Sequence, residues 1–291
     1  DIAIGIGLFG VGIGLRTLRW QSILAFRARV PFAMSLRALL AGYAVNSLLP
    51  ARLGEFFRAH YLARLADLSR SVVLASIVVE RMLDLLTVIC ALALGLALAG
   101  GGDSASRHVL IGGAAIVAAA VLVLLLIVLL LSRHSAEDLL LQLVARVPGG
   151  AAIARRGGAM LVNFTQALEV VRTRHFLFAV LLTLPIWVVE ARAMWSVCRA
   201  VGVNLDLAGM LSLLGGASLS TLVPTAPGYV GSYQAAFVVI LGQFGVTATS
   251  ALVAATAVQV YLIGSFTLLG LAIMAIAALM AMARPAKPPE S

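Results

Sequence analysis

Long apolar stretches separated by short arginine-rich gaps are the dominant pattern of this sequence. A helix needs about 20 apolar residues to cross the hydrocarbon core of a bilayer, and several stretches reach or approach that length. We therefore predict an all-α, polytopic membrane protein. The predicted uninterrupted spans cover residues 2–18, 71–99, 108–131, 176–197 and 250–282.

Two more apolar stretches are each interrupted by a proline, and we predict that each forms a re-entrant helical hairpin broken by Pro and Gly. Such a hairpin enters and leaves the membrane at the same face, so that the chain turns back at membrane depth. The first hairpin is predicted over 33–49 and 53–66 around Pro50, and the second over 207–223 and 230–244 around Pro224.

The two hairpins also resemble each other, which predicts an inverted repeat. Each contains a Leu-x-Pro break, then a Gly and, further along the chain, a Ser. Nine residues after that Ser, the first copy has Glu80 and the second has Gln259. Matched breaks in halves of opposite orientation are typical of secondary transporters, although similar apolar strings can also match by chance. We predict a first transmembrane repeat over 1–132, a cytoplasmic amphipathic connector over 133–174 and a second transmembrane repeat over 175–291.

Composition and charge narrow the class further. Hydrophobic residues make up 62% of the chain and charged residues only 11%, whereas a soluble protein carries about 25% charged residues, which argues against a water-soluble enzyme. The net charge of +9 comes from arginines in the gaps, which favours cytoplasmic loops over nucleic-acid binding. With both hairpins re-entrant, 15 basic residues, Arg16 and Arg19 among them, lie on one side, and only Arg107 and Arg199 lie on the other. We predict a multi-pass protein of the cytoplasmic (inner) membrane.

Charged residues inside the apolar stretches are the candidates for a functional site. Each costs about 3 kcal/mol at the centre of a bilayer unless it is paired or hydrated, so we expect them to converge on a protein interior or a water-filled cavity. Their formal charges sum to zero, which a purely structural ion-pair network would also explain. Because apolar residues would hold helices together at least as well, we favour a substrate site. The residues are Arg52, Glu55, Arg58, Glu80, Arg81, Asp84, Glu190 and Arg192.

The residue types at this site favour an anionic, phosphate-bearing head group as the ligand. Arginine presents paired planar donors that match the oxygens of a phosphate. We expect Arg52 and Arg58 to bind the phosphate. When the site is empty, Glu55, Glu80 and Asp84 are expected to hold these arginines in position.

The second break is expected to expose unpaired backbone amide and carbonyl groups. Such backbone is tolerated at membrane depth only where it is buried in protein or lines a cavity. A plain turn at Pro227 and Gly228 would also fit the sequence. The remaining candidate residues for binding or translocation are Asn46, Pro50, Pro224, Gly231, Tyr233 and Gln259.

The sequence shows no motif of a catalytic site, a nucleotide-binding loop or a metal centre. We therefore predict that the protein is not an enzyme and carries no cofactor or metal. From the residues alone we expect a transporter whose polar central cavity binds a phosphate-bearing head group, with a secondary transporter of a small solute or ion as an alternative.

Three motifs resemble those of a known family: 46–59 (NSLLPARLGEFFRA), 80–86 (ERMLDLL) and 224–231 (PTAPGYVG), with Arg19-Trp20 fitting the same pattern. The sequence resembles the transmembrane domain of lysylphosphatidylglycerol synthases, a flippase-like family. The resemblance implies a membrane domain that moves lipids between leaflets. In bifunctional members this domain is fused to a cytoplasmic aminoacyl-transferase, which we expect to be absent here, so no synthase activity is expected.

Together with the residues above, the resemblance predicts a lipid translocase that moves a phosphate-bearing lipid or lipid-linked intermediate between leaflets through a polar central cavity. The alternatives are a non-catalytic subunit that presents lipid to a separate aminoacyl- or glycosyl-transferase, and a secondary transporter of a small solute or ion. The expected partners are membrane lipids, such a transferase and further copies of the chain.

Overall fold

In a computed structural model of the chain, the described residues are 2–49, 52–99, 168–223 and 226–282, together with 112, 115, 119 and 122. Every regular element within them is a helix, so the predicted all-α class is confirmed. Several predicted features lie outside the described residues. These are the span over 108–131 apart from the four single residues, most of the connector over 133–174, and both Pro50 and Pro224.

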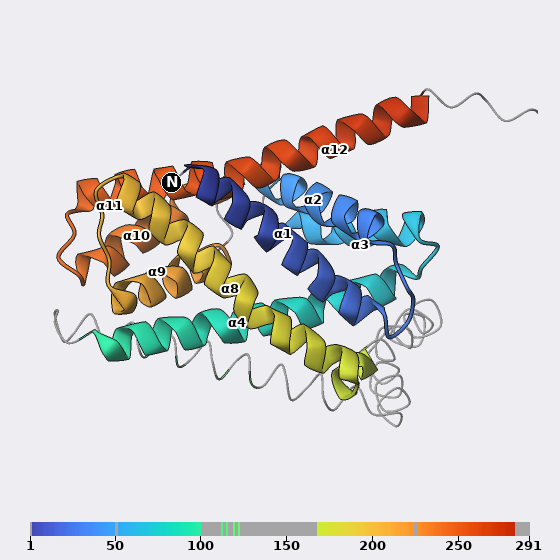
Figure 1. Cartoon of the computed structure of the whole chain (residues 1–291), viewed down its shortest axis with the longest axis horizontal. Coiled ribbons are helices and arrows are strands. Elements are labelled where there is room, and N and C mark those ends of the chain that lie inside the picture. Colours follow the sequence, from blue (N-terminus) through green and yellow to red (C-terminus); the bar gives the residue numbers. More distant parts are fainter. Residues whose placement is uncertain are drawn as a thin grey trace, which may run out of the picture.

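The longest helices run along most of the molecule, and shorter ones pack beside them (Figure 1). The described elements are α1 (Ile2–Leu24), α2 (Phe32–Leu48), α3 (Leu53–Leu65), α4 (Arg70–Leu98), the 3₁₀ turn η1 (Glu169–Arg172), α8 (Arg174–Ala200), α9 (Leu207–Ser220), the 3₁₀ turn η2 (Pro227–Tyr229), α10 (Ser232–Gly242), α11 (Ala248–Gln259), the π-helical turn η3 (Val260–Gly264) and α12 (Ser265–Met282).

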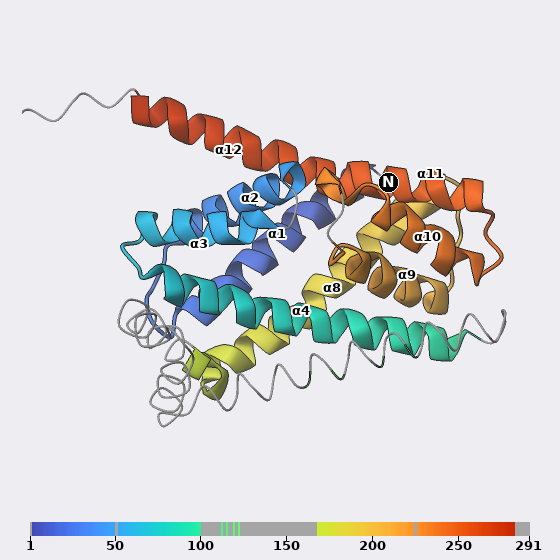
Figure 2. The same ribbon diagram turned by 180° about the vertical axis from the view of Figure 1, so that it is seen from behind.

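Two pairs of short helices occupy different halves of the molecule (Figures 1 and 2). Helices α2 and α3 pack against each other in one half, and α9 and α10 do so in the other. The C-terminal end of α2 and the N-terminal end of α3 lie near the middle of the long axis, where η2, between α9 and α10, contacts α2. The long α4 contacts α3 and α9, and the rod α11–η3–α12 contacts α10 and α2. The two helix breaks therefore lie next to each other near the middle of the molecule, with exposed residues such as Leu49 and Val223 beside them.

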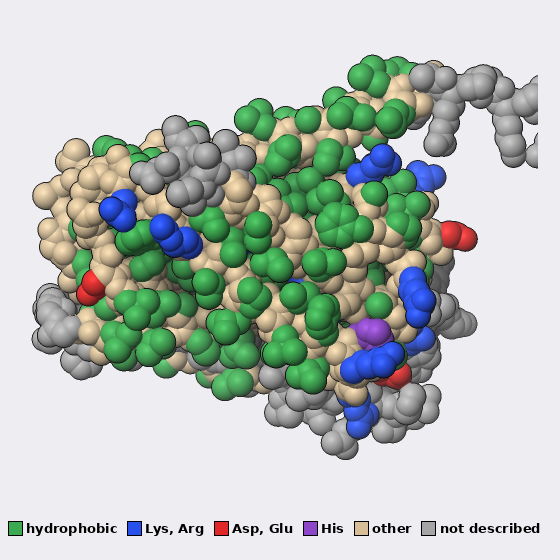
Figure 3. Space-filling view, viewed as in Figure 1, with side chains coloured by type: hydrophobic (Ala, Val, Ile, Leu, Met, Phe, Trp, Pro, Cys, Tyr) green, Lys and Arg blue, Asp and Glu red, His purple; other side chains and the backbone are tan. Residues whose placement is uncertain are grey.

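The surface of the long helices is suited to lipid. Two described helical stretches, Arg174–Ala200 with 27 residues and Ala248–Met280 with 33, are long and apolar enough to cross a bilayer. They expose large side chains such as Leu181, Leu184 and Leu268. Figure 3 shows apolar side chains spread over much of one face. A continuous apolar surface of this kind indicates contact with a membrane or another protein.

Basic side chains gather at one end of the molecule (Figure 3). Helices α1 and α3 end there, and α2, α4 and α8 begin there. This end is the candidate cytoplasmic face, because short cytoplasmic loops are enriched in arginine and lysine. The seven described arginines at or near it are Arg27, Arg29, Arg37, Arg64, Arg70, Arg172 and Arg174.

The first span is longer than its sequence pattern predicts. The pattern ends the span at residue 18 and counts Arg16 and Arg19 among the basic residues of the following gap, but α1 continues to Leu24 and buries both side chains. Each arginine has a carboxylate partner on another helix. Because a paired arginine is tolerated in a membrane interior, these two residues do not mark the end of the helix.

Buried apolar side chains form three clusters among the described residues, and arginine side chains contact the two largest. The larger cluster lies where α4 and α8–α11 meet and includes Leu213, Phe237 and Trp187. The other lies among α1–α4 and includes Trp20 and Leu62. Both tryptophans lie under arginine guanidinium groups. The charged residues therefore occupy the region between the apolar clusters.

Glycines permit the closest approaches between helices. A Cβ atom on Gly54 of α3 would collide with the carbonyl oxygen of Gly42 and with the side chain of Asn46 on α2. A Cβ on Gly215 of α9 would collide with Leu92 on α4. Small residues at such contacts let helix backbones approach closely, as is common in membrane proteins.

Candidate functional site

Arg52 connects the two helix breaks. It precedes α3 with a φ of 54°, a left-handed backbone conformation that is uncommon for residues other than glycine. Its Nε donates to the Thr221 carbonyl oxygen at 3.2 Å, and its Nη2 donates to the Thr221 hydroxyl at 2.7 Å. Thr221 directly follows α9, so the guanidinium adds positive charge at the C-terminal end of that helix, where cations are favoured.

Asp84 on α4 is held from two other helices. Arg19 of α1 donates to both carboxylate oxygens, at 2.6 Å to Oδ1 and 3.1 Å to Oδ2. Trp187 of α8 donates its indole N–H to Oδ1 at 3.2 Å, and Thr183, also on α8, accepts from Arg19 at 3.3 Å. A bidentate pair of this kind imposes a defined geometry, so it fixes α1, α4 and α8 relative to one another.

Arg58 on α3 and Glu80 on α4 form a second bidentate pair, with both Nη–Oε distances at 3.0 Å. Only 2% of Arg58 and 1% of Glu80 is exposed. The Arg58 guanidinium carbon lies 3.5 Å from the centre of the Trp20 ring, a cation–π contact. The indole N–H in turn donates to the Ser76 hydroxyl at 3.0 Å. This enclosure makes Arg58 part of the supporting structure.

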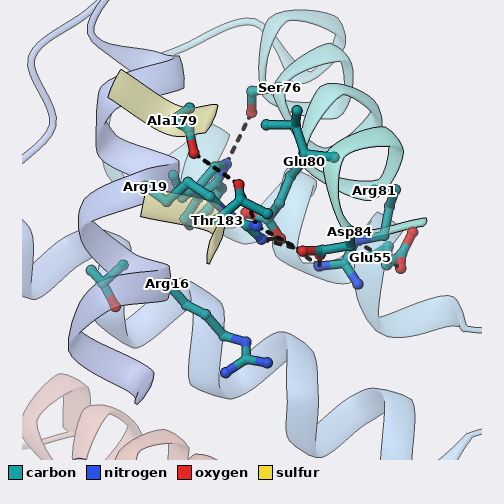
Figure 4. A network of polar contacts seen from close by, with 12 residues as sticks. Arg16, Arg19, Glu55, Ser76, Glu80, Arg81, Asp84, Ala179 and Thr183 are labelled. Carbon is teal, nitrogen blue, oxygen red and sulfur yellow. Dashed lines mark hydrogen bonds and ion pairs between the residues drawn. The ribbon is translucent and has the colours of Figure 1, made fainter. Parts of the chain in front are cut away.

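Arg81, the next residue after Glu80, lies among three carboxylates (Figure 4). Its Nη2 donates to Glu80 at 2.5 Å and lies 3.2 Å from Asp84 Oδ2, and its Nε lies 3.8 Å from Glu55. The Nε–H has no hydrogen-bond partner among the described residues. Glu80 and Asp84 each have another, bidentate arginine partner, so neither depends on Arg81 for its charge balance.

A separate ion pair joins α1 to α8. Arg16 Nη2 donates to Glu190 Oε2 at 2.9 Å, and the guanidinium carbon lies 5.8 Å from the centre of the Trp187 ring. In Figure 4 the Arg16 side chain points away from the network around Asp84. The interior therefore contains two groups of charges that share the same supporting helices.

The described interior cluster contains one more arginine than carboxylate. The sequence pattern suggests equal numbers, but the structure adds Arg16 and Arg19 and leaves Arg192 outside. The cluster therefore has a formal charge of +1, from five guanidinium groups and four carboxylates. Its members are Arg16, Arg19, Arg52, Arg58, Arg81, Glu55, Glu80, Asp84 and Glu190.

A cavity of about 190 Å³ lies beside this cluster, where the two helix breaks meet. One water needs only about 10–15 Å³ on this measure, so the cavity can hold a polar head group with some water. A lipid with two acyl chains is far too large for it. Three arginines line the cavity: Arg16, Arg52 and Arg81. The predicted site residues along it are Asn46, Arg52, Glu55, Arg81, Asp84, Glu190 and Tyr233.

The other predicted residues that the structure describes do not line the cavity. Arg58 and Glu80 form the enclosed pair, Pro227, Gly228 and Gly231 belong to the second break, and Gln259 ends α11. Sequence reasoning missed several lining residues, although helix spacing could have found two of them. Trp187 lies three residues before Glu190, and Tyr43 three before Asn46, and residues at this spacing share a helix face. The missed polar and aromatic residues are Arg16, Tyr43, Ser47, Trp187, Ser218, Thr221, Tyr229 and Phe266.

Arg192 departs most from its predicted position. The sequence pattern places it in the interior with Glu190, but the structure exposes it on the outer surface of α8. Residues two apart on a helix are separated by about 200° because one turn takes about 3.6 residues. The two side chains therefore cannot point into the same cavity.

The second break is held by a chain of amide hydrogen bonds. Its glycines, Gly228 and Gly231, have φ values of 69° and 95°, which residues with side chains rarely adopt. Gln259 donates to the Gly228 carbonyl oxygen at 2.6 Å and accepts from Gln234 at 2.5 Å. The Gln234 side-chain oxygen accepts from the Gly231 N–H at 2.8 Å. Gln259 thus joins the end of α11 to the second break.

Substituting Gln259→Leu is expected to speed backbone amide hydrogen exchange around Gly228 by about tenfold or more, since two hydrogen bonds worth about 1 kcal/mol each are lost. Hydrogen–deuterium exchange with mass spectrometry would measure the change. Gln243→Leu is the matched control, because the buried Oε1 of Gln243 accepts no hydrogen bond among the described residues. Equal exchange in both variants would show that the amide chain does not hold the break.

Comparisons with known proteins give two matches. The family model described as "Lysylphosphatidylglycerol synthase TM region" matches residues 2–270. The UPF0104 membrane protein MJ1078 of Methanocaldococcus jannaschii is 22% identical over 205 residues, covering 68% of this chain and 78% of the relative. No solved structure matches the chain significantly. The family match includes every described helix except the end of α12.

Proposed function

We propose that this chain, which belongs to the lysylphosphatidylglycerol synthase transmembrane family, moves an anionic, phosphate-bearing lipid between the leaflets of its membrane. Family membership confirms the expectation from the sequence motifs and identifies the chain as a membrane domain. In the proposed mechanism the cavity binds the polar head group, and the acyl chains stay in the surrounding lipid.

The observation that carries this proposal is the excess arginine beside the cavity. A positive charge without a counter-ion is costly in a membrane interior, and a singly charged phosphodiester would neutralise the cluster. Arg16, Arg52 and Arg81 line the cavity, and the Arg81 Nε–H has no hydrogen-bond partner among the described residues. Planar guanidinium donors match phosphate oxygens in geometry as well as charge.

We also propose that the pairs α2–α3 and α9–α10 are re-entrant hairpins related as an inverted repeat. Two features support this relation. The first pair begins and ends at the arginine-rich end, whereas the second begins and ends at the opposite end. In addition, Glu80 and Gln259, which match in the sequence pattern, each bond to the second helix of the preceding pair, at Arg58 and Gln234. The arginine-rich end would face the cytoplasm of a multi-pass inner-membrane protein.

Arg52 would couple head-group binding to a change in the protein. Its Nε and Nη2 donate to Thr221. A phosphate would compete for those donors, because hydrogen bonds between charged groups are stronger than those to a neutral carbonyl or hydroxyl. Binding would therefore weaken the connection between the two breaks and favour their separation. No catalytic step, metal or cofactor is proposed for this chain.

A liposome assay with the purified chain tests this function. The liposomes contain a trace of phosphatidylglycerol with a fluorescent label that a membrane-impermeant reductant can bleach. We expect label from the inner leaflet to become accessible when the protein is present, and to stay protected in protein-free liposomes. Labelled phosphatidylcholine is expected to move more slowly, because its head group carries no net charge. Full protection of the inner-leaflet label in both preparations would exclude translocation by the chain alone.

A second candidate function is presentation of lipid to a separate transferase. The family description favours it, because that description names the transmembrane region of a synthase. In this case the purified chain would bind phosphatidylglycerol without moving it and would stimulate an added transferase. Uptake of inorganic phosphate by the same liposomes, without lipid movement, would instead indicate a solute transporter.

A further inference from the structure

We infer that the outer surface of α8 carries a second binding surface for anionic lipid head groups, far from the arginine-rich end. It consists of Arg192, Trp195 and Arg199, which we call the α8 surface. We assume for it only the membrane placement of the proposed function, and no transport. Its ligand would be the phosphodiester of a lipid in the leaflet remote from the cytoplasm.

Two guanidinium groups lie against one indole ring at this surface. The guanidinium carbons of Arg192 and Arg199 lie 4.3 Å and 4.6 Å from the centre of the Trp195 ring. Both arginines are exposed, and the tryptophan is partly buried. The indole N–H donates to the Leu205 carbonyl oxygen at 3.2 Å, which fixes the orientation of the ring. The ring thus fixes the position of both guanidinium groups, each within 4.6 Å of its centre.

Within the part of the chain that the structure describes, Arg192 and Arg199 lack the carboxylate partners that the interior arginines have. Every arginine of the interior cluster has a carboxylate within 4.0 Å, but Arg192 and Arg199 have none among the described residues. The negative end of the helix dipole favours Arg199 in the last turn of α8, but its effect does not reach back about two turns to Arg192. An anion beside this ring would supply negative charge to both guanidinium groups.

The position of the surface selects lipid as the source of that anion. Residues 192, 195 and 199 follow the spacing of one helix face, whereas Glu190 and Met194 of the same helix line the cavity. The surface lies on the helix that exposes Leu181 and Leu184 elsewhere along its length. Tryptophan is enriched where a membrane meets water, and guanidinium groups match phosphate. Ser196, whose hydroxyl accepts from Arg192 at 2.7 Å, adds a polar group at the same place.

Fluorescence quenching tests the surface directly. The full chain in detergent micelles is titrated with phosphatidylglycerol that carries brominated acyl chains. Trp195 is the reporter, because Trp20 and Trp187 are 0% and 9% exposed, and Trp195→Phe identifies its share of the signal. We expect saturable quenching, with an apparent Kd that rises by about fivefold for each of Arg192→Gln and Arg199→Gln. Brominated phosphatidylcholine is expected to quench less and to be unaffected by either change.

The control removes two exposed arginines from the other end of the molecule, as Arg64→Gln with Arg70→Gln, and should leave the titration unchanged. Equal quenching by the two lipids in the unchanged protein would overturn the proposal, and so would an equal loss in the control. Displacement of the lipid by inorganic phosphate would overturn the assignment to a lipid ligand. The assay measures binding alone, so its result does not depend on whether the chain moves lipid.

Discussion

The Arg81→Gln variant is expected to move phosphatidylglycerol about tenfold more slowly than the unchanged protein, since one hydrogen bond to a charged group is worth about 1.5–3 kcal/mol. It should remain folded, because Glu80 and Asp84 each keep a bidentate arginine partner. The substitution removes the excess charge of the cluster.

Glu55→Gln changes the cluster charge in the opposite direction and is expected to strengthen binding of the anionic head group. The liposome assay and a phosphatidylglycerol binding titration would measure the two effects.

Opposite signs for the two variants are the critical result. If charge selects the head group, Arg81→Gln weakens binding of phosphatidylglycerol and Glu55→Gln strengthens it. Arg81→Lys keeps the charge but loses the planar donors, so it should be intermediate. A change in the same direction for both variants would show that packing, rather than the charge of the cluster, controls binding.

The Glu80→Gln variant is expected to lose about 3–5 kcal/mol of unfolding free energy, the typical effect of removing one partner of a buried ion pair. Glu80 bonds to Arg58, which is only 2% exposed. Without Glu80, Arg58 would have no carboxylate within 4.0 Å among the described residues. The sequence analysis expects Glu80 to hold an arginine of the site in position, so that its loss would stop transfer in a protein that still folds. Its burial instead predicts that folding fails before transfer can be measured. Thermal unfolding in detergent would measure the loss.

Two further variants separate burial from charge. Glu55→Gln removes a carboxylate whose side chain is 22% exposed and whose arginine contacts are 3.7 Å and 3.8 Å long, so it should cost about 1 kcal/mol or less. The double variant Arg58→Gln with Glu80→Gln should be more stable than the sum of its single changes predicts, because no unpaired buried charge remains. Additive losses would show that the pair is not coupled.

The apolar pattern predicts most helix bounds well where arginines mark the ends of a stretch. The spans expected over 71–99 and 176–197 are α4 (Arg70–Leu98) and α8 (Arg174–Ala200). The same rule fails for α1, because Arg16 and Arg19 are paired inside the helix bundle. The π-helical turn η3 inside the last span has no signal in hydrophobicity, since it changes hydrogen bonding without changing composition.

The site residues could be predicted as candidates but not as pairs. Glu190 stands out as a carboxylate in an apolar helix, yet its partner Arg16 is 174 residues away in the chain. A single sequence contains no local pattern that joins the two. Helix geometry, by contrast, is enough to separate Glu190 from Arg192. The enclosure of Arg58 over Trp20 depends on three helices packing together, so only the structure distinguishes a supporting arginine from one at the cavity.

The π-helical turn η3 interrupts a helical rod that contacts both short-helix pairs, α10 through α11 and α2 through α12. Turns of this type are often found at functional positions in helices. A displacement of either pair would bend the rod, and the irregular turn is where bending disturbs the fewest regular hydrogen bonds. With the bend at η3, α11 would follow α10 while α12 follows α2, so each short-helix pair could shift without unfolding the helix packed against it.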